Sequence, residues 1–222
     1  MIKKLVAMLL LSGTVISSAA YAAPHHSGDI MVRGGIAGTL VDDGHSTIRE
    51  DDIVTNTSLT IDDGISVGAD FVYFFNRNWA FEAGLTGPFK HDLYLHGVFE
   101  DPKFGSVLQA TPTLSALFYI DRAWDFKPYV GLGVSYTMFF SEDFAGDAAD
   151  NLGYENLTFK QSIGAVGQFG ADYQVNRNWF VNANVKYVTM SSDVTYTVLT
   201  NNRNTTMDIN PWIFSFKVGY KF

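Results

Sequence analysis

The chain has 222 residues, enough for one domain, with 15 Lys and Arg against 23 Asp and Glu and a formal net charge of −8. This acidic balance excludes the basic footprint that nucleic-acid binding needs, and the absence of cysteine excludes a small disulfide scaffold. Aromatic residues make up 15% of the chain and Gly occurs 20 times, a composition typical of outer-membrane barrels and also of some secreted β-sandwiches.

The first 22 residues have the organisation of a secretory signal peptide. Lys3 and Lys4 form the basic region, an apolar segment runs from Leu5 to Ile16, and residues 20–22 (Ala-Tyr-Ala) supply the small-x-small cleavage pattern. We expect cleavage after Ala22, with Ala23 as the next candidate. An uncleaved anchor is the alternative, but the apolar core is too short to span a bilayer comfortably. The mature protein is therefore expected to be a single domain of residues 23–222.

Eight segments of the mature chain alternate between apolar and polar or small residues, the period of two that sends successive side chains to opposite faces of a strand. In the first segment Val32 and Ile36 share one face, and Arg33 lies on the other. The expected strands cover residues 30–40, 65–73, 79–85, 114–120, 130–138, 163–173, 179–187 and 212–222. An even number of strands is what bacterial outer-membrane barrels require.

The last of these strands has the clearest alternation. One face carries only large apolar residues, and the other carries mostly polar or small ones. The apolar face consists of Trp212, Phe214, Phe216, Val218, Tyr220 and Phe222. A soluble sandwich would also alternate, but it would rarely place so many bulky residues in a single row that ends on a C-terminal Phe.

The connections between the expected strands alternate in length. Residues 76–78, 121–127 and 176–178 are expected to be short turns, and 41–63, 91–107, 141–156 and 191–205 long polar loops. Short periplasmic turns and long extracellular loops are typical of outer-membrane proteins. Because lipid offers no hydrogen-bond partners, the first strand must also pair with the last. We therefore predict an all-β fold, an eight-stranded antiparallel transmembrane β-barrel in the outer membrane of a Gram-negative bacterium.

Several short motifs accompany this pattern. They are Gly-Pro-Phe-Lys-His at 87–91, Lys-Pro-Tyr-Val-Gly-Leu-Gly at 127–133, Tyr-Thr-Met-Phe-Phe at 136–140, residues 172–179 with their Asn-Arg-Asn-Trp ending, and the segment 210–222. Together they resemble the outer membrane protein W family over essentially the whole mature chain. The resemblance implies a barrel with an apolar internal pocket that helps small hydrophobic molecules across the outer membrane. It also implies that the last strand, ending in Phe222, is read by the barrel-assembly machinery.

The same family tends to place bulky apolar residues in the lumen of its third and seventh strands. The nearest inward positions of this chain are Gly84 and Lys186. The resemblance therefore does not extend to an identical gate.

The inward positions predict two layers in the lumen. Charged residues near the short-turn end are expected to pair and fill the lumen, since isolated buried charges are costly. This predicted plug consists of Arg33, Asp70, Glu82, Asp172, Lys186, Lys217 and Lys221. Apolar residues nearer the long loops are expected to form a ligand-binding cup of Phe139, Val188, Met190, Ile209 and Ile213. An eight-stranded barrel has room for side chains or one small ligand, so a general water-filled pore is excluded.

The function hypothesis is that an apolar solute enters the cup from outside, is stopped by the plug, and leaves sideways through an opening between strands. Pro112 and Pro211 lack ladder donors and could weaken the strand pairing locally. In the competing interpretation, the apolar inward residues are simply packing core. The barrel would then be structural or adhesive, and its loops would bind a host or phage surface.

No catalytic residues, cofactor or metal site are expected. A Ser–His pair for lipid chemistry would have to come from His45, His91, His96, Ser46 or Ser106, and we interpret these histidines as solvated loop residues. His25 and His26 are placed in a flexible N-terminus, with too few ligands for a metal. The acidic groups at 50–52, 62–63 and 142–143 either bind cations that bridge lipopolysaccharide or form a solvated face. The expected partners are outer-membrane lipid and lipopolysaccharide, the assembly machinery and a small hydrophobic solute.

Overall fold

The computed structural model of the protein describes residues 24–41, 46–50, 53–96, 103–120, 125–144, 154–198 and 201–222. The expected signal peptide, residues 1–22, lies outside the described residues. In the part of the chain that is described, no helix is long and apolar enough to cross a membrane.

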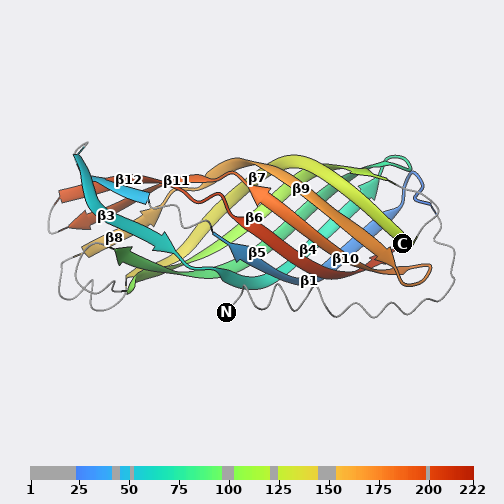
Figure 1. Ribbon diagram of the computed structural model, residues 1–222, viewed down its shortest axis with the longest axis horizontal. Coiled ribbons are helices and arrows are strands. Elements are labelled where there is room, and N and C mark those ends of the chain that lie inside the picture. The colour runs from blue at the N-terminus through green and yellow to red at the C-terminus, as the bar shows by residue number, and fades with distance from the viewer. Residues whose placement is uncertain are drawn as a thin grey trace.

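Eight antiparallel strands close into a barrel (Figure 1), which confirms the predicted fold class. Around the barrel the strands follow the order β5-β4-β1-β13-β10-β9-β7-β6, and the pairing of β5 with β6 completes the circle. Their bounds are β1 (Ile30–Leu40), β4 (Gly64–Phe74), β5 (Trp79–His96), β6 (Lys103–Tyr119), β7 (Phe126–Phe144), β9 (Ser162–Gln174), β10 (Trp179–Val188) and β13 (Trp212–Lys221). The first and last strands pair along their whole length, from Met31–Lys221 to Leu40–Trp212, so neither leaves an unpaired edge towards lipid.

Two of the short turns are built in the same way. In each, an Asn side chain accepts hydrogen bonds from two backbone amides, the arrangement of an Asx turn. Asn76 Oδ1 accepts from the amides of Asn78 (2.9 Å) and Trp79 (3.0 Å). Asn176 Oδ1 accepts from the corresponding amides two and three residues further along, at 3.0 and 2.9 Å. The repeated Asn-Arg-Asn-Trp sequence therefore forms two equivalent hairpins at the short-turn end.

Much of the chain expected to be loop is β-structure instead. β2 (Ser46–Glu50) and β3 (Ile53–Ile61) extend the barrel sheet beside β5, and β8 (Tyr154–Phe159), β11 (Ser191–Val198) and β12 (Asn201–Asp208) form a separate sheet. In Figure 1 these strands lie beyond the barrel, at the end opposite the C-terminus. The connections are long, as predicted, but they contain strands that the alternation did not indicate, because β3 and β12 are rich in Thr, Ser and Asn. β11 does alternate, but its apolar row has only three members, Val194, Tyr196 and Val198, and is shorter than the rows of the barrel strands.

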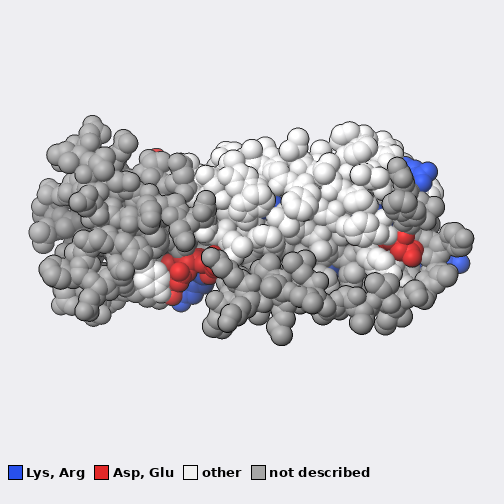
Figure 2. Space-filling model, viewed as in Figure 1, with Lys and Arg blue, Asp and Glu red and all other residues white. Residues whose placement is uncertain are grey.

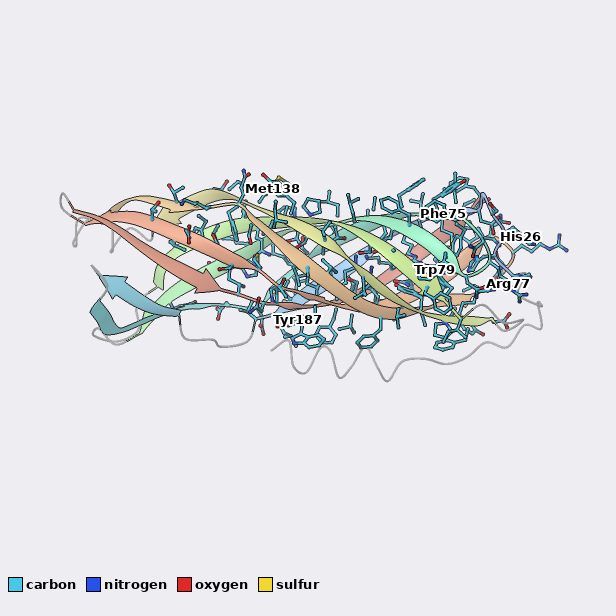
Figure 3. The ribbon with its side chains drawn as sticks, turned by 90° about the horizontal axis from the view of Figure 1, so that it is seen from above. His26, Phe75, Arg77, Trp79, Met138 and Tyr187 are labelled. Atoms are coloured by element: carbon cyan, nitrogen blue, oxygen red, sulfur yellow. The ribbon has the colours of Figure 1, made fainter. Side chains whose placement is uncertain are left out.

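The outer face of the barrel is apolar. Leu132 and Ile163 expose 76% and 78% of their surface, and on the face seen in Figure 2 the described surface over the middle of the barrel is almost without charge. At the short-turn end aromatic rings pack edge to face, with Trp179 and Tyr220 at 5.2 Å and Trp79 and Phe118 at 5.1 Å between centroids. Figure 3 places Trp79 at this end, beside Phe75 and Arg77. An apolar band with an aromatic belt is the surface that a barrel presents to a bilayer.

The lumen is filled by three layers, named here from the short-turn end upwards. The lower apolar layer consists of Met31, Val72, Phe74, Ala80, Leu117, Tyr119, Tyr129 and Phe180. Above it is a layer of charged side chains, described below. The upper apolar layer consists of Ala37, Phe89, Val166, Val188 and Ile213. The charged layer lies below the upper apolar layer because of the order of inward residues along each strand. Towards the long-loop end, Lys186 is followed by Val188 on β10, and Arg33 is followed by Ala37 on β1.

Candidate functional site

The middle of the lumen is closed by a charged layer of three cations and three anions. Each of the six side chains is almost fully buried, with at most 2% of its surface exposed. They are Arg33 on β1, Asp70 on β4, Glu82 on β5, Asp172 on β9, Lys186 on β10 and Lys217 on β13. Opposite charges in equal number allow every buried charge to lie beside a partner, which is the condition for keeping ions inside a protein.

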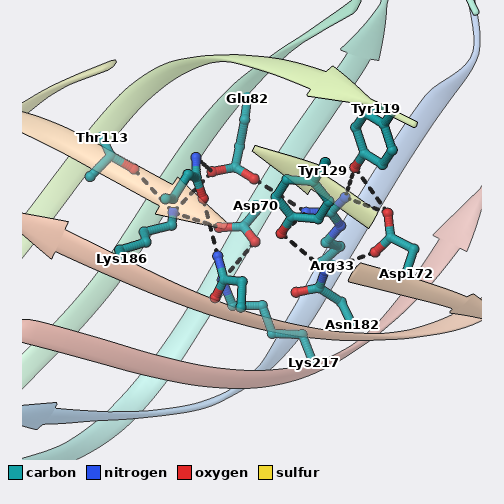
Figure 4. A network of polar contacts seen from close by, with 12 residues as sticks. Arg33, Asp70, Glu82, Thr113, Tyr119, Tyr129, Asp172, Asn182, Lys186 and Lys217 are labelled. Atoms are coloured by element: carbon teal, nitrogen blue, oxygen red, sulfur yellow. Dashed lines mark hydrogen bonds and ion pairs between the residues drawn. The ribbon is translucent and has the colours of Figure 1, made fainter. Parts of the chain in front are cut away.

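Arg33 lies at the centre of the lower half of this layer (Figure 4). Its guanidinium contacts two carboxylates, with Nη1 3.2 Å from Glu82 Oε2 and Nη2 2.8 Å from Asp172 Oδ2. The same nitrogens donate to the hydroxyls of Tyr119 and Tyr129. The Tyr119 hydroxyl in turn donates to Asp172 Oδ2 at 2.9 Å. Arg is suited to this position because its planar fork holds several acceptors at once and stays charged at all accessible pH values.

Two lysines complete the upper half of the layer. Lys186 Nζ lies 2.9 Å from Glu82 Oε1 and 3.8 Å from Asp70 Oδ1. Lys217 Nζ lies 2.6 Å from Asp70 Oδ2. Glu82 therefore bridges Arg33 and Lys186, and Asp70 lies between the two lysines. The six charges form one connected network that draws on strands around the whole barrel.

Neutral side chains occupy the remaining hydrogen-bonding positions of the layer. Asn182 Nδ2 donates to Asp172 Oδ1 at 2.8 Å, and Gln168 Nε2 donates to Glu82 Oε1 at 3.0 Å. Thr113 Oγ1 accepts from Lys186 Nζ at 3.4 Å, at the upper edge of the network. These polar partners explain how so many charges stay inside a narrow barrel.

Six of the seven residues predicted for the plug meet in this layer, and Lys221 does not. Its Nζ lies 3.5 Å from Asp29 Oδ2 at the short-turn end, and 15% of its side chain is exposed. Lys221 is the last residue of β13, so its inward side chain lies at the end of the barrel and not beside the charged layer. The sequence interpretation also missed Lys127, which is buried on β7 with Asp172 as its Cα partner. Lys127 could have been predicted to point inward, because it lies two residues before the inward Tyr129 on the same strand.

Gly84 provides the space that the charged layer needs. A Cβ at this position would lie 2.8 Å from Thr113 Oγ1, 2.9 Å from Asp70 Oδ1 and 3.1 Å from Lys186 Nζ. A bulky residue on β5 and this network therefore exclude each other. Gly84 and Lys186, the two inward positions singled out in the sequence, therefore lie side by side in the charged layer.

The N-terminal segment closes the barrel from below. His25 is 4% exposed and its ring stacks on Phe74 with 4.0 Å between centroids. Burial, followed by the nearby charges of Lys127, Lys221 and Arg33, lowers the pKa of His25 to about 2, so the ring is neutral. The expectation of a flexible N-terminus at His25 was therefore wrong, since its ring packs against Phe74 and Tyr119 of the lower apolar layer. His26, in contrast, is exposed and lies at the outer end of the barrel in Figure 3.

The residues expected to form an apolar cup lie at the upper end of the lumen. Val188 and Ile213 belong to the upper apolar layer, and Met190 and Ile209 are buried just above it, where the amide of Ile209 donates to the Met190 carbonyl at 2.9 Å. Phe139 is partly buried and its ring lies 5.2 Å from that of Phe159. These side chains come from strands on the β7–β13 side of the barrel and from the segments that leave it.

The upper lumen also has a polar side, which the phasing did not predict. Gln109, Thr111 and Thr137 are buried on β6 and β7. Gln109 Nε2 donates to Thr111 Oγ1 at 3.2 Å, and the hydroxyls of Thr111 and Thr137 are 3.5 Å apart. The upper lumen is therefore amphipathic, with apolar side chains on one side and hydroxyl and amide groups on the other.

A β-bulge in β5 places two more residues in the upper lumen. The pairing of β5 with β6 shifts by one residue between Thr86 and Phe89. Below the shift the even-numbered residues of β5 are buried, and above it Phe89 and His91 are. A bulge sets two residues opposite one and so reverses the phase of the strand. The interpretation of His91 as a solvated loop residue was therefore wrong.

The pairing of β6 with β7 is interrupted beside the upper lumen. Ala110 pairs with Met138 and Thr113 with Ser135, but the described ladder contains no pairs for Thr111 or Pro112. Pro112 has no amide hydrogen to donate. Pro211, the other proline of the hypothesis, lies above β13, where its carbonyl accepts from the amide of Val188 at 3.2 Å, so it marks no comparable interruption.

The candidates for lipid chemistry do not form a described site. His45 lies outside the described residues, and the side chains of His96 and Ser46 are likewise not described. Ser106 is on β6 with Asp92 as its Cα partner. Among the residues that the structure does describe, no group of three His, Asp or Glu side chains could hold a metal ion.

A closed eight-stranded barrel with an apolar outer band, an aromatic belt and a charge-filled lumen defines a transmembrane barrel of the bacterial outer membrane. Residues 26–222 match the model of the OmpW family, and the chain belongs to this family. Outer membrane protein W of Salmonella typhimurium is 34% identical over 230 residues, which cover 99% of this chain and 100% of the relative.

Among solved structures, the crystal structure of the outer membrane protein OprG from Pseudomonas aeruginosa is similar, with a TM-score of 0.84 and 32% sequence identity. The match covers 90% of this chain and 98% of that chain. A more distant relative, also from Pseudomonas aeruginosa, is the dibenzothiophene metabolism operon protein PahQ, 22% identical over 169 residues, which cover 76% of this chain and 77% of PahQ. The family match and the OprG structure place the chain among outer-membrane barrels.

Proposed function

We propose that this barrel helps small apolar molecules to leave the outside medium and enter the outer membrane. The observation that carries the proposal is the charged layer, which closes the lumen directly beneath the upper apolar layer. A molecule that reaches Val188 or Ile213 from the long-loop end meets apolar side chains first and a complete ionic network next. Crossing that network would require separating buried charges, which costs several kcal/mol per ion. The lumen is therefore a place for a solute to rest and not a route to the periplasm.

The route out of the lumen is sideways, through the interruption between β6 and β7. Thr113 contacts Lys186 at the upper edge of the charged layer, and the missing pairs at Thr111 and Pro112 come next along β6. On the outside, Leu114 and Ile163 flank this level and are 50% and 78% exposed, so the interruption opens onto the lipid-facing band. An apolar solute that leaves here passes from one apolar environment to another, which follows its partition preference.

The name of a relative agrees with this substrate class. PahQ is named for an operon of dibenzothiophene metabolism, and dibenzothiophene is a flat aromatic molecule without charge. A relative named for the metabolism of such a compound is consistent with a role of this barrel in moving apolar solutes.

The proposal is tested by solute flux into liposomes that contain the purified barrel. We expect an apolar aromatic such as naphthalene to reach an enzyme trapped inside faster than in protein-free liposomes, whereas glucose and K⁺ show no excess flux. Val188→Asn puts an amide into the upper apolar layer and should lower naphthalene flux about tenfold, because an amide without partners is costly in that layer. Val188→Leu keeps the layer apolar and serves as the matched control. Equal excess flux of naphthalene and glucose, or none of either, would contradict the proposal.

A second candidate function rests on the strands beyond the barrel. β2, β3, β8, β11 and β12 give the long-loop end a structured surface, which suits a structural or adhesive barrel that binds a host or phage surface. A variant lacking residues 191–208 separates the two candidates. Loss of surface binding with unchanged naphthalene flux would favour adhesion, and the reverse would favour transport. Contacts with lipopolysaccharide and with the assembly machinery belong to the same proposal and are expected for either function.

A further inference from the structure

His91 has a buried ring nitrogen that no described group satisfies. The residue is 1% exposed, and its Nε2 has no hydrogen-bond partner among the described residues. Its other ring nitrogen, Nδ1, lies 2.7 Å from the backbone carbonyl oxygen of Asp62. A buried polar atom without a partner loses its hydration and gains nothing in return. This nitrogen, Nε2, is therefore placed to bind a group that the described residues do not supply.

The contact of Nδ1 with Asp62 determines whether Nε2, the other ring nitrogen, donates or accepts a hydrogen bond. A carbonyl oxygen only accepts hydrogen bonds, so Nδ1 must carry the proton that it donates. In the neutral ring the proton is then absent from Nε2, which presents a lone pair. Nε2 of His91 is consequently an acceptor, and it binds hydrogen-bond donors such as a hydroxyl group. A ketone, ether or carboxylate has no hydrogen to offer it.

The position of the ring connects this acceptor with the upper lumen. The bulge in β5 turns His91 and Phe89 to the same inner face, and their ring centroids are 6.0 Å apart. Both rings pack over Gly64, where an added Cβ would lie 3.1 Å from His91 Cε1 and 3.2 Å from Phe89 Cδ1. Phe89 belongs to the upper apolar layer. The acceptor therefore lies at the upper margin of the layer that the proposed function assigns to the solute.

We infer that His91 Nε2 binds the hydroxyl group of an apolar alcohol or phenol whose hydrocarbon part lies against the upper apolar layer. The inference rests on the proposed function for the direction of transport, but the binding site itself does not depend on transport. It narrows the substrate class from apolar molecules in general to apolar molecules with a hydroxyl group. Hydrogen bonds that satisfy an otherwise unpaired buried group discriminate more strongly than extra hydrocarbon does.

The first test measures binding by nuclear magnetic resonance of the imidazole nitrogens in the complete barrel reconstituted in nanodiscs. The His91 signals are identified by their loss in His91→Gln. Addition of 1-decanol should shift the Nε2 resonance, because that atom begins to accept a hydrogen bond, while decane and 2-decanone leave it unchanged. An Nε2 signal that ignores 1-decanol, or responds equally to the ketone, would overturn the inference and leave water as the occupant of the site.

The second test measures selectivity of flux in liposomes. In the protein with His91 the ratio of 1-decanol to decane flux should exceed the ratio in His91→Phe by about tenfold, the effect of one well-placed hydrogen bond to a buried group. His91→Gln keeps both a donor for Asp62 and an acceptor, and should retain part of the preference. His26→Phe makes the same change at an exposed histidine and should keep all of it.

The outcomes separate this inference from the proposed function. Equal alcohol-to-alkane ratios in the protein with His91 and in His91→Phe, with decane flux still present, would overturn the hydroxyl site and leave apolar transport standing. A shifted Nε2 resonance without flux of either solute would support the site and contradict transport. Heat-modified mobility in gel electrophoresis establishes that each variant is folded, and if His91→Phe does not fold, the resonance of the unaltered protein decides.

Discussion

At the scale of single residues, the charged layer depends on complementary charge and on space. Asp70 and Lys217 meet at 2.6 Å, and neither side chain is exposed. A buried ion pair gains little over an apolar pair of the same size, but an ion that loses its partner inside a protein is strongly destabilising. The charges of the lumen are thus interdependent, and changes to them should not be additive.

The Asp70–Lys217 pair tests this interdependence. Lys217→Met leaves Asp70 with only the more distant Lys186, 3.8 Å from its Oδ1, and should lower the free energy of unfolding by about 3–5 kcal/mol. Asp70→Asn together with Lys217→Met removes both charges and should be less destabilised than Lys217→Met alone. Urea titration of Trp fluorescence in lipid vesicles measures Lys217→Met, Asp70→Asn, the double variant and the parent. A double variant whose loss equals the sum of the single losses would contradict a coupled layer.

Gly84 tests the requirement for space. Gly84→Ala puts a methyl group within 3.1 Å of Asp70, Thr113 and Lys186, so the ion pairs must move apart, at a cost of about 1–3 kcal/mol for overpacking. This is the opposite of the small gain that Ala usually brings over Gly in a strand. Gly34→Ala is the matched control, because a Cβ at Gly34 would meet nothing within 4 Å. Equal stability of the two variants in the same urea titration would mean that the layer does not need Gly84.

Strand alternation predicted some residues of the charged layer and missed others. Arg33, Glu82 and Asp172 were predicted to be inward by strand alternation alone, and the structure brings them within hydrogen-bond distance. The tyrosine and amide partners were not predicted, because alternation gives the face of a strand and not its neighbours across the lumen. His25 was missed because the segment before β1 has no periodicity. Its burial results from tertiary stacking on Phe74.

At the scale of elements, the bulge in β5 decides which residues line the upper lumen. Gly87 has a φ of +119°, and an added Cβ there would lie 2.7 Å from the Gln109 carbonyl oxygen and 2.9 Å from Ala110 Cα. Only Gly adopts this backbone conformation at no cost, and no other residue allows so close an approach. The phase of β5 above this point therefore depends on one glycine.

Gly87→Ala should disturb this part of the strand. We expect a loss of about 1–3 kcal/mol in the free energy of unfolding from the backbone strain alone, together with a changed environment for His91. Urea titration gives the first quantity and the imidazole nitrogen resonances of His91 give the second. Gly167→Ala is the control, since a Cβ at Gly167 would meet nothing within 4 Å and its φ lies outside the strained range. Unchanged stability and unchanged His91 resonances in Gly87→Ala would show that the bulge tolerates a side chain.

The same element explains an error in the sequence interpretation. Alternation predicted the lower part of β5 correctly, from Trp79 to Leu85. It ended the strand at Leu85, short of its observed end at His96, because the bulge beyond Thr86 reverses the phase and the two halves do not form one continuous pattern. The strands beyond the membrane were missed for a different reason. β3 and β12 are rich in Thr, Ser and Asn, and the apolar row of β11 has only three members, so their alternation is short or absent.

At the scale of the whole molecule, the three layers of the lumen and the interrupted β6–β7 ladder together suit the lateral exit of an apolar solute. The lower apolar layer and the charged layer close the barrel to water and ions. In the proposed function, the upper layer is where an apolar solute binds, and the β6–β7 interruption at Pro112 is where it passes into the lipid. The central claim is that solute leaves through the side of the barrel and not through its lower end.

A reversible cross-link over the interruption tests this claim most directly. The pairs on either side, Ala110–Met138 and Thr113–Ser135, place Pro112 opposite Tyr136, and the chain has no cysteine of its own. Cysteines at 112 and 136 can therefore form a single disulfide across the opening, because paired strand residues lie within disulfide reach. Leu114 and Val134 are Cα partners on the same two strands within the paired region, and cysteines at these positions provide the control.

The measurement is naphthalene flux into liposomes for both double-cysteine variants, oxidised and then reduced, with completion of the cross-link established by gel mobility. The account predicts that oxidation of the 112/136 variant abolishes the excess flux and that reduction restores it, while the 114/134 variant transports equally well in both states. Undiminished flux through a fully cross-linked 112/136 barrel would contradict lateral exit.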